Sequence, residues 1–227
     1  MTTTKTATAS KGLLRTLAAL CLTASLVGLR APDGSAAATP QEGVAYVQIA
    51  HPVTASPREV VEVFWYDCPH SYLLAQPLRD WAAQQKPPVT IRHIPAAWSN
   101  QPEEMAYARL YYTLDKLGIE DSVEQDVFHA VRDERLDLTT LGALQEWASQ
   151  EGIDPQRLTD AWNSPQVQQE TQDAPALRER YDVHEMPSVV VGGRYRTTPF
   201  IAPGGVDGTL PVVDYLLQHS TAQAARH

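Results

Sequence analysis

The chain has 227 residues, which is enough for one domain of ordinary core size, one domain with an insertion, or two small packed domains. It carries 27 acidic side chains against 18 basic ones, a net charge of −9, and has no cluster of Arg or Lys. A surface of this sign repels nucleic acid and anionic membranes, so we expect no nucleic-acid partner.

The first 38 residues differ in composition from the rest of the chain. Lys5, Lys11 and Arg15 precede or open the apolar run LLRTLAALCLTASLVGL, and three alanines follow, ending at Ala38. This order is typical of a secretory signal peptide and predicts cleavage after Ala38 and export. An uncleaved membrane anchor is the alternative, but polar residues interrupt a run already short for a span of about 20 apolar residues. Cleavage leaves 14 basic and 26 acidic side chains, a net charge of −12.

The next elements follow a strand, helix, strand order. After an irregular lead-in with a short strand at 45–49, residues 58–67 (REVVEVFWYD) are dense in β-branched and aromatic side chains, which predicts a buried strand. Residues 71–85 place their apolar side chains on one helical face, and Pro77 should kink this helix without ending it. Residues 87–98 (PPVTIRHIPAAW) predict a second strand. The three form a βαβ unit, whose crossover should be right-handed.

From Asn100 to about Arg180 the apolar period is helical throughout. About five helices with brief connections are indicated, which we interpret as a helical insertion. The residues that mark their ends are Pro102, Gly118, Thr140, Gly152, Asp154, Pro155, Ser164 and Pro165. Residues 188–197 then read strand, two glycines, strand, the strongest hairpin signal in the chain, and residues 210–218 predict a closing helix.

A strand that ends in Cys68-Pro69 and continues as a helix places the sulfur at the helix N-cap. Pro69 suits the first helical position because its missing N–H would have no partner there. The free N–H groups of His70 and Ser71, with the partial positive charge of the helix end, favour the thiolate over the thiol. A protonated His70 adds to this effect, whereas Asp67 opposes it. Because the thiolate is the nucleophile in disulfide exchange, we predict a reactive Cys68 rather than a buried structural cysteine.

Cys68-Pro69-His70-Ser71 has the spacing of a C-x-x-C dithiol motif with a hydroxyl in place of the second sulfur. Ser71 is close enough to donate its N–H, and its hydroxyl as well, to a Cys68 thiolate, but it cannot attack a mixed disulfide. Cys21 lies in the predicted signal peptide, so the exported chain contains no other thiol. Release of a trapped partner therefore needs an external thiol, such as glutathione or the client's own second cysteine.

Two other chemistries find no support in the sequence. A cysteine protease would need a paired base, and nothing in the sequence identifies one. The histidines outside the motif fall at no metal-ligand spacing, so no metal site and no cofactor beyond an external thiol are predicted. Among these histidines are His51, His93, His129, His184 and His219.

Several segments, in this order, resemble the DsbA family, the bacterial periplasmic disulfide oxidoreductases with a thioredoxin fold. VVEVFWYDCPHSY (60–72) is similar to the family's strand and active-site helix, and HEMPSVVVGGRYRTTP (184–199) to the segment that contains its cis-proline. IEDSVEQDVFHAV (119–131) and DAWNSPQV (160–167) resemble two helices of its insertion. The resemblance extends over about residues 45–218.

The resemblance implies an α/β, thioredoxin-like fold with an inserted all-helical domain. The signal peptide at 1–38 is then followed by the first part of the thioredoxin-like domain at 39–97 and the helical insertion at 98–180. The second part of the thioredoxin-like domain occupies 181–220, and a C-terminal tail 221–227.

The resemblance also implies roles for residues outside the motif. Pro187 is expected to be cis and to lie beside the sulfur, and the backbone of Met186 to pair with an extended client peptide. Glu62 stands at the position of a buried family acid. The family's basic partner on the next strand has no clear counterpart, because Ile91 stands at its place with Arg92 and His93 as neighbours. Glu62 is therefore expected to be protonated or differently paired.

Together these observations favour a periplasmic DsbA-type thiol:disulfide interchange protein that acts on exported, unfolded or cysteine-containing proteins through mixed disulfides at Cys68. The serine favours exchange, isomerisation or deglutathionylation over self-resolving oxidation, with a small-molecule thiol or a membrane redox partner as the second reactant. One alternative is a redox-inactive thioredoxin-fold module that binds peptides near Met186 and Pro187 as a chaperone would. Another is a glutathione-dependent enzyme in which the serine activates a bound thiol.

Overall fold

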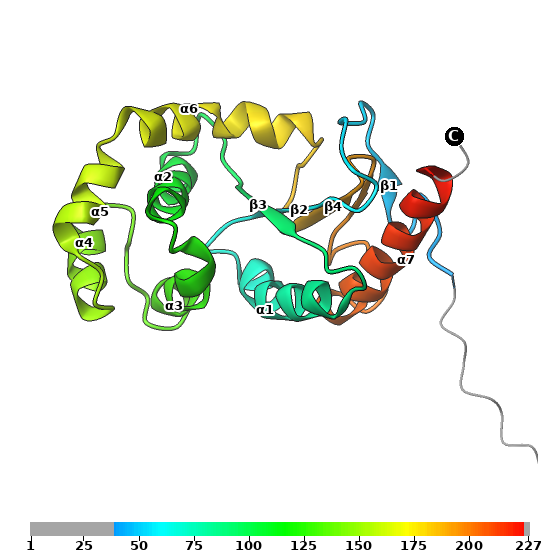
Figure 1. The fold of residues 1–227 in the computed structure, drawn as a ribbon, viewed down its shortest axis with the longest axis horizontal. Helices are drawn as coiled ribbons and strands as arrows, with labels where there is room; N and C mark the ends of the chain where they lie inside the picture. Colours follow the sequence, from blue (N-terminus) through cyan, green and yellow to red (C-terminus); the bar gives the residue numbers. More distant parts are fainter. Residues whose placement is uncertain (1–38, 225–227) are drawn as a thin grey trace, which may run out of the picture. The chain divides into compact units, whose positions relative to one another are not determined.

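A computed structural model describes residues 39–224, and the predicted signal peptide lies outside the described residues. A mixed sheet of five strands, in the order β1-β5-β4-β2-β3, forms the centre of this part of the chain (Figure 1). β2 runs parallel to β3 and antiparallel to β4, and β5 pairs antiparallel with both β4 and β1. The strands are β1 (Val47–Gln48), β2 (Val60–Phe64), β3 (Ile91–Pro95), β4 (Ser188–Val191) and β5 (Tyr195–Thr197).

Two helices cover one face of the sheet. The helix α1 (Pro69–Gln84) connects β2 to β3, and it continues through Pro77 as predicted. The helix α7 (Val206–Ala224) begins earlier and ends later than the sequence pattern indicated. Apolar side chains of both helices pack on those of β2 and β4, as in the cluster of Leu74, Leu78, Val60, Val189, Val191, Val213 and Leu216. Burial of this apolar area, at about 25 cal/mol per Å², holds the two helices on the sheet.

The opposite face of the sheet packs against the end of α6 (Pro165–Arg180) and the segment that follows it. Val61 and Val63 of β2 and Ile94 of β3 contact Tyr181 and Val183 there. Both faces are therefore covered, and all five residues of β2 are buried. A strand of this kind reads as a continuous apolar run, which makes its one charged residue, Glu62, conspicuous.

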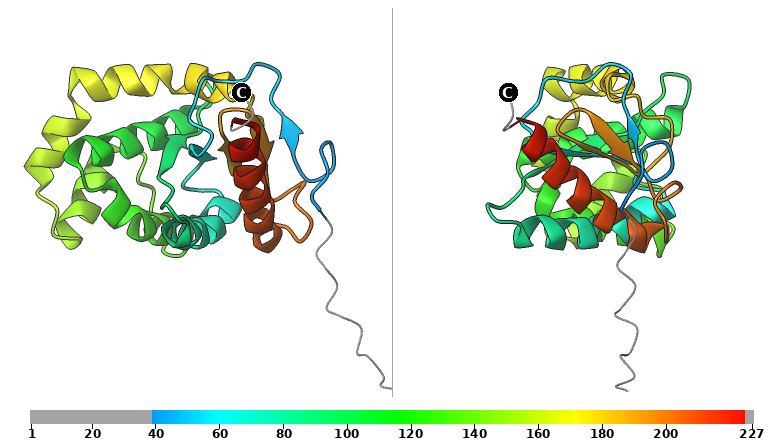
Figure 2. Two further views of the ribbon diagram at one scale, coloured as in Figure 1. Left: turned by 45° about the vertical axis from the view of Figure 1, so that its right-hand side comes forward. Right: turned by 90° about the vertical axis from the view of Figure 1, so that its right-hand side faces the viewer.

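Between β3 and β4 the chain forms five helices: α2 (Pro102–Leu117), α3 (Glu120–Arg132), α4 (Leu141–Gln150), α5 (Pro155–Trp162) and α6. The predicted caps are present, since the Thr140 hydroxyl accepts from the N–H of Ala143 and Gly118 ends α2 with a φ of 69°. Figures 1 and 2 show α2 to α5 beside the sheet, with α6 returning the chain to it. These helices share an aromatic-rich core that includes Phe64 and Tyr66 from the end of β2.

The predicted hairpin joins β4 to β5 through two glycines. Gly192 and Gly193 have φ values of 59° and 62°, the left-handed backbone that a two-residue turn of this kind requires. A Cβ atom on Gly193 would lie 2.1 Å from the carbonyl oxygen of Val53, so only glycine fits there. None of the helices in residues 39–224 is both long and apolar enough to cross a membrane.

Candidate active site at the N-terminus of α1

Cys68 is the N-cap of α1, with the extended backbone (φ −90°, ψ 119°) that lets a strand enter a helix. Pro69 occupies the first helical position, and Cys68 is a free thiol with 8% of the residue exposed. The thiol donates a hydrogen bond to the carbonyl oxygen of Met186, with 3.4 Å between sulfur and oxygen. The peptide bond between Met186 and Pro187 is cis, as expected. Residues 118 positions apart in the sequence are thus brought together at one thiol.

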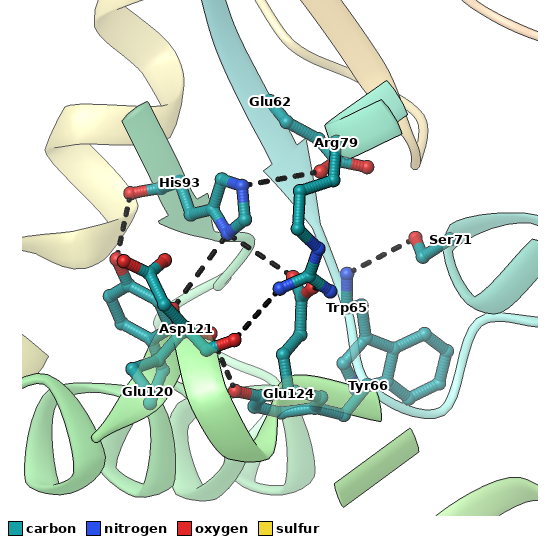
Figure 3. A network of polar contacts seen from close by, with 10 residues as sticks. Glu62, Trp65, Tyr66, Ser71, Arg79, His93, Glu120, Asp121 and Glu124 are labelled. Carbon is teal, nitrogen blue, oxygen red and sulfur yellow. Dashed lines mark hydrogen bonds and ion pairs between the residues drawn. The ribbon is translucent and has the colours of Figure 1, made fainter. Parts of the chain in front are cut away.

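Ser71 is completely buried and points toward the end of β2. Its hydroxyl oxygen accepts a hydrogen bond from the backbone N–H of Trp65, with an N–O distance of 3.3 Å (Figure 3). The expectation that this hydroxyl bonds to the Cys68 sulfur is not met among the described residues, because its hydrogen-bond partner is the strand backbone. Ser71 therefore stabilises the turn between β2 and α1.

Asp67 and His70, which flank the sulfur, have contacts in the structure that the sequence did not indicate. Asp67 forms an ion pair with Arg132 of α3, whose guanidinium also donates to the Asp67 carbonyl oxygen at 2.7 Å. This pairing offsets the negative charge that would oppose a thiolate. The ring of His70 packs edge-on against Phe200, with 4.9 Å between ring centroids. Phe200 and Leu73 are large apolar side chains that remain 54% and 60% exposed near this end of α1.

A second group of polar side chains lies beneath the motif, and we call it the buried cluster: Glu62, Arg79, His93, Glu120 and Glu124 (Figure 3). Glu62 is 1% exposed, which confirms that it is a buried acid. The register of β2 and β3 places His93 opposite Glu62, whereas Ile91 is opposite Val60. The expectation that Ile91 lies opposite Glu62 is therefore wrong. Its neighbour His93 lies there, so the acid does face a basic residue.

Distances within the buried cluster centre on the imidazole ring. His93 Nε2 lies 3.9 Å from Glu62 Oε2, and His93 Nδ1 lies 3.2 Å from Glu124 Oε1 and 3.9 Å from Glu120 Oε2. The guanidinium of Arg79 pairs with the other oxygen of Glu124 and donates to the carbonyl oxygen of Asp121 at 2.8 Å. The hydroxyl of Tyr66 donates to Glu120 at 3.3 Å. Four elements, β2, α1, β3 and α3, thus supply one buried cluster.

Burial dominates the ionisation of the buried cluster. It raises the pKa of Glu62 to about 8 and that of Glu120 to about 7, while the charge of His93 opposes both shifts. Burial also works against the imidazolium, but contact with Glu124 and the charges of Glu62 and Glu120 raise the pKa of His93 to about 9. At neutral pH, Glu62 and His93 therefore both carry a proton.

Sequence reasoning identified the motif, Met186, Pro187 and Glu62, but it missed Arg79, Arg132, His93, Glu120 and Glu124. Helix α3 supplies two of these acids, and their signal was weak because acidic residues in the first turn of a helix are ordinary. A helix-end cysteine beside a cis-proline, on a sheet interrupted by a helical insertion, defines the class of thioredoxin-fold thiol oxidoreductases.

Comparisons with known proteins agree with this class. A family model described as a DSBA-like thioredoxin domain matches residues 100–208. The thiol:disulfide interchange protein DsbA of Pseudomonas aeruginosa is 30% identical over 213 residues, which cover 92% of this chain and 98% of the relative. That of Bordetella pertussis is 34% identical over 178 residues, or 77% and 84% of the two chains. This chain belongs to the DsbA family of thiol:disulfide oxidoreductases.

Solved structures support the same assignment. The crystal structure of Pseudomonas aeruginosa DsbA superposes with a TM-score of 0.74 at 30% identity, over 82% of this chain and 97% of that one. The oxidoreductase DsbA of Xylella fastidiosa has a TM-score of 0.69 at 27% identity, over 81% and 99%. The α/β thioredoxin-like fold with a helical insertion is thereby confirmed.

Proposed function

We propose that this protein is a periplasmic thiol:disulfide exchange enzyme that works with a single thiol, Cys68, and depends on an external thiol for turnover. The observation that carries the proposal is the position of Ser71. A buried hydroxyl bonded to the N–H of Trp65 stands where a dithiol motif has its second sulfur. Residues 39–227 contain no other cysteine. Export by the predicted signal peptide would place this thiol in the periplasm, where disulfides form and persist.

The chemistry is two successive exchanges without net oxidation. The Cys68 thiolate attacks one sulfur of a client or glutathione disulfide, a new S–S bond forms, and the other sulfur leaves as a thiolate. An external thiolate then attacks the mixed disulfide, takes the partner's sulfur and releases the Cys68 thiolate. Each step exchanges one S–S bond for another, so the number of disulfides is unchanged. In deglutathionylation the external thiol is the reductant and leaves as part of a disulfide, whereas isomerisation consumes no reductant. The cycle suits disulfide isomerisation and deglutathionylation.

The surroundings of Cys68 fit unfolded protein clients. The backbone of Met186 lies against the sulfur, where an extended peptide can pair with it. The exposed side chains of Phe200 and Leu73 offer apolar contacts of the kind that an unfolded chain supplies. The proposed partners are exported, cysteine-containing proteins, with a glutathione-class thiol or a membrane redox partner regenerating Cys68.

Release of a peptide from its glutathione mixed disulfide tests this proposal. The purified protein should accelerate release only when free glutathione is present, and Cys68→Ala should release no more than the uncatalysed reaction. Without glutathione, mass spectrometry should detect a stable mixed disulfide on Cys68. Equal rates for the parent and Cys68→Ala, with peptide binding intact, would instead support a redox-inactive peptide-binding module.

A further inference from the structure

Three members of the buried cluster have the chemistry and spacing of metal ligands. Glu62, His93 and Glu124 can each offer one ligand atom, and these atoms all lie within 4.8 Å of one another. They come from β2, β3 and α3, so the sheet register and the position of one helix fix their separation. Figure 3 shows the imidazole of His93 between the two carboxylates, with Nε2 toward Glu62 and Nδ1 toward Glu124.

One carboxylate oxygen of this group lacks a partner. Glu62 Oε1 is buried and has no hydrogen-bond partner, and the contact of His93 Nδ1 with Glu124 Oε1, at 3.2 Å, does not meet hydrogen-bond geometry. The side chains of Glu62 and Glu124 are each only 1% exposed. A buried carboxylate oxygen without a partner is costly, and a bound cation is one way to satisfy it.

The charge balance also suits one divalent cation. Metal ligation would displace the protons of Glu62 and His93, and the three carboxylates with the Arg79 guanidinium would then leave two net negative charges. A cavity of about 240 Å³ reaches the site on its His93 side. Three acids, Glu120, Asp115 and Asp121, line this cavity against one base, Arg92, so acidic side chains predominate there.

We propose that Glu62, His93 and Glu124 bind one divalent transition-metal ion of the zinc class. One imidazole nitrogen with two carboxylates is a ligand set that Zn²⁺ accepts with a fourth position left open, whereas Ca²⁺ and Mg²⁺ favour oxygen ligands alone. Glu120 lies beside this open position, 3.9 Å from the imidazole. The ion lies under the active-site strand and is separate from the thiol chemistry of Cys68.

Calorimetric titration with zinc chloride tests the proposal. The purified protein, carrying Cys68→Ser to remove the competing thiolate and stripped of metal with a chelator, should bind one Zn²⁺ and show a higher thermal midpoint in its presence. His93→Gln and Glu62→Gln should each weaken binding by more than about 100-fold, since loss of outer-shell partners alone costs about 10–100-fold. Magnesium chloride at the same concentration should not replace zinc.

His129→Gln is the matched control. His129 contacts Asp133 and Glu134 on the surface and is 57% exposed, so it is the natural place for adventitious zinc. Binding lost in this variant but kept in His93→Gln would overturn the proposal, as would the absence of binding to the stripped protein. Histidine side-chain NMR provides a readout that needs no change in the buried cluster. Zinc should shift the His93 signals, and shifts confined to exposed histidines would also overturn the proposal.

Discussion

The motif at the start of α1 and the buried cluster beneath it are both attached to β2, but they are built in opposite ways. The motif consists of four consecutive residues, 68–71, at a helix end that reaches the surface. The buried cluster takes its charged groups from four elements and keeps Glu62 and Glu124 almost fully buried. The geometry around the Cys68 thiol therefore depends on a local turn, whereas the buried charges depend on long-range packing. Changes in the motif should alter rates, and changes in the buried cluster should alter the free energy of unfolding.

Ser71→Cys should have the largest effect, a shorter lifetime of the mixed disulfide at Cys68, with the buried cluster unchanged. The new thiol can attack the mixed disulfide between Cys68 and a client, releasing the client thiol and closing an intrachain disulfide. Because intramolecular attack has a high effective concentration, the lifetime of the mixed disulfide without external thiol should fall by more than about 100-fold. Acid quenching followed by mass spectrometry measures this lifetime.

Ser71→Ala is the control for that change. It removes the hydrogen bond from the N–H of Trp65, which should lower the free energy of unfolding by about 1 kcal/mol. Turnover should still require glutathione. If Ser71→Ala shortened the lifetime of the mixed disulfide as Ser71→Cys does, the missing second thiol would not be the reason for the dependence on external thiol.

Arg79→Met should lower the free energy of unfolding and leave the rate of peptide release nearly unchanged. It leaves the carboxylate of Glu124, which is 1% exposed, without its guanidinium partner. Because the Arg79 side chain is itself 32% exposed, the loss should be smaller than for a fully buried pair, about 2 kcal/mol. Urea denaturation should show this loss, while the initial rate of peptide release at low urea stays near that of the parent. Arg79→Lys, which keeps the charge, should lose less. A release rate that falls as far as that of Cys68→Ala would show that the two regions are not independent.

The pH dependence of stability should come mainly from the buried cluster. The folded state binds more protons than the unfolded chain between about pH 4.5 and 8 at Glu62, and between about pH 6.5 and 9 at His93. The free energy of unfolding of metal-free protein should therefore fall as the pH rises from about 5 to 9. Urea midpoints measured across this range in chelator test the direction.

Glu62→Gln tests how much of this pH dependence comes from Glu62. Its side chain stays neutral at every pH, so the decline below about pH 8 should become shallower. A reduced part from His93 should remain, because Glu124 and Glu120 still raise its pKa when the charge of Glu62 is gone. A stability that is flat or rises between pH 5 and 9 in the parent would contradict the raised pKa values of both groups.

The order of elements was predictable from the sequence because its signals are local. The β-branched run before Cys68, the proline at the first position of α1, the cap at Thr140 and the paired glycines 192 and 193 each act within a few residues. The structure has a helix or strand at each of these places. The length of α7 was underestimated because its first and last turns lack a continuous apolar pattern.

The acid–base pairing in the buried cluster was not predictable in the same way. Ile91 and His93 are two residues apart, so their side chains leave the strand on the same side, and apolar alternation fits either of them as the neighbour of Glu62. The register of β2 against β3 decides in favour of His93. Glu120, Glu124 and Arg79 then join through the packing of α3 and α1, which no short-range pattern in the sequence specifies.

A strand that leads through Cys68 and Pro69 into a helix, with a serine where a second thiol would stand, follows from consecutive residues, since backbone preference and helix polarity act over one turn. The direction of the Ser71 hydroxyl, the thiol contact with Met186 and the assembly of the buried cluster depend on residues up to 118 positions away. Only the folded chain settles these contacts, because sheet register and helix packing set distances between side chains that sequence spacing leaves open.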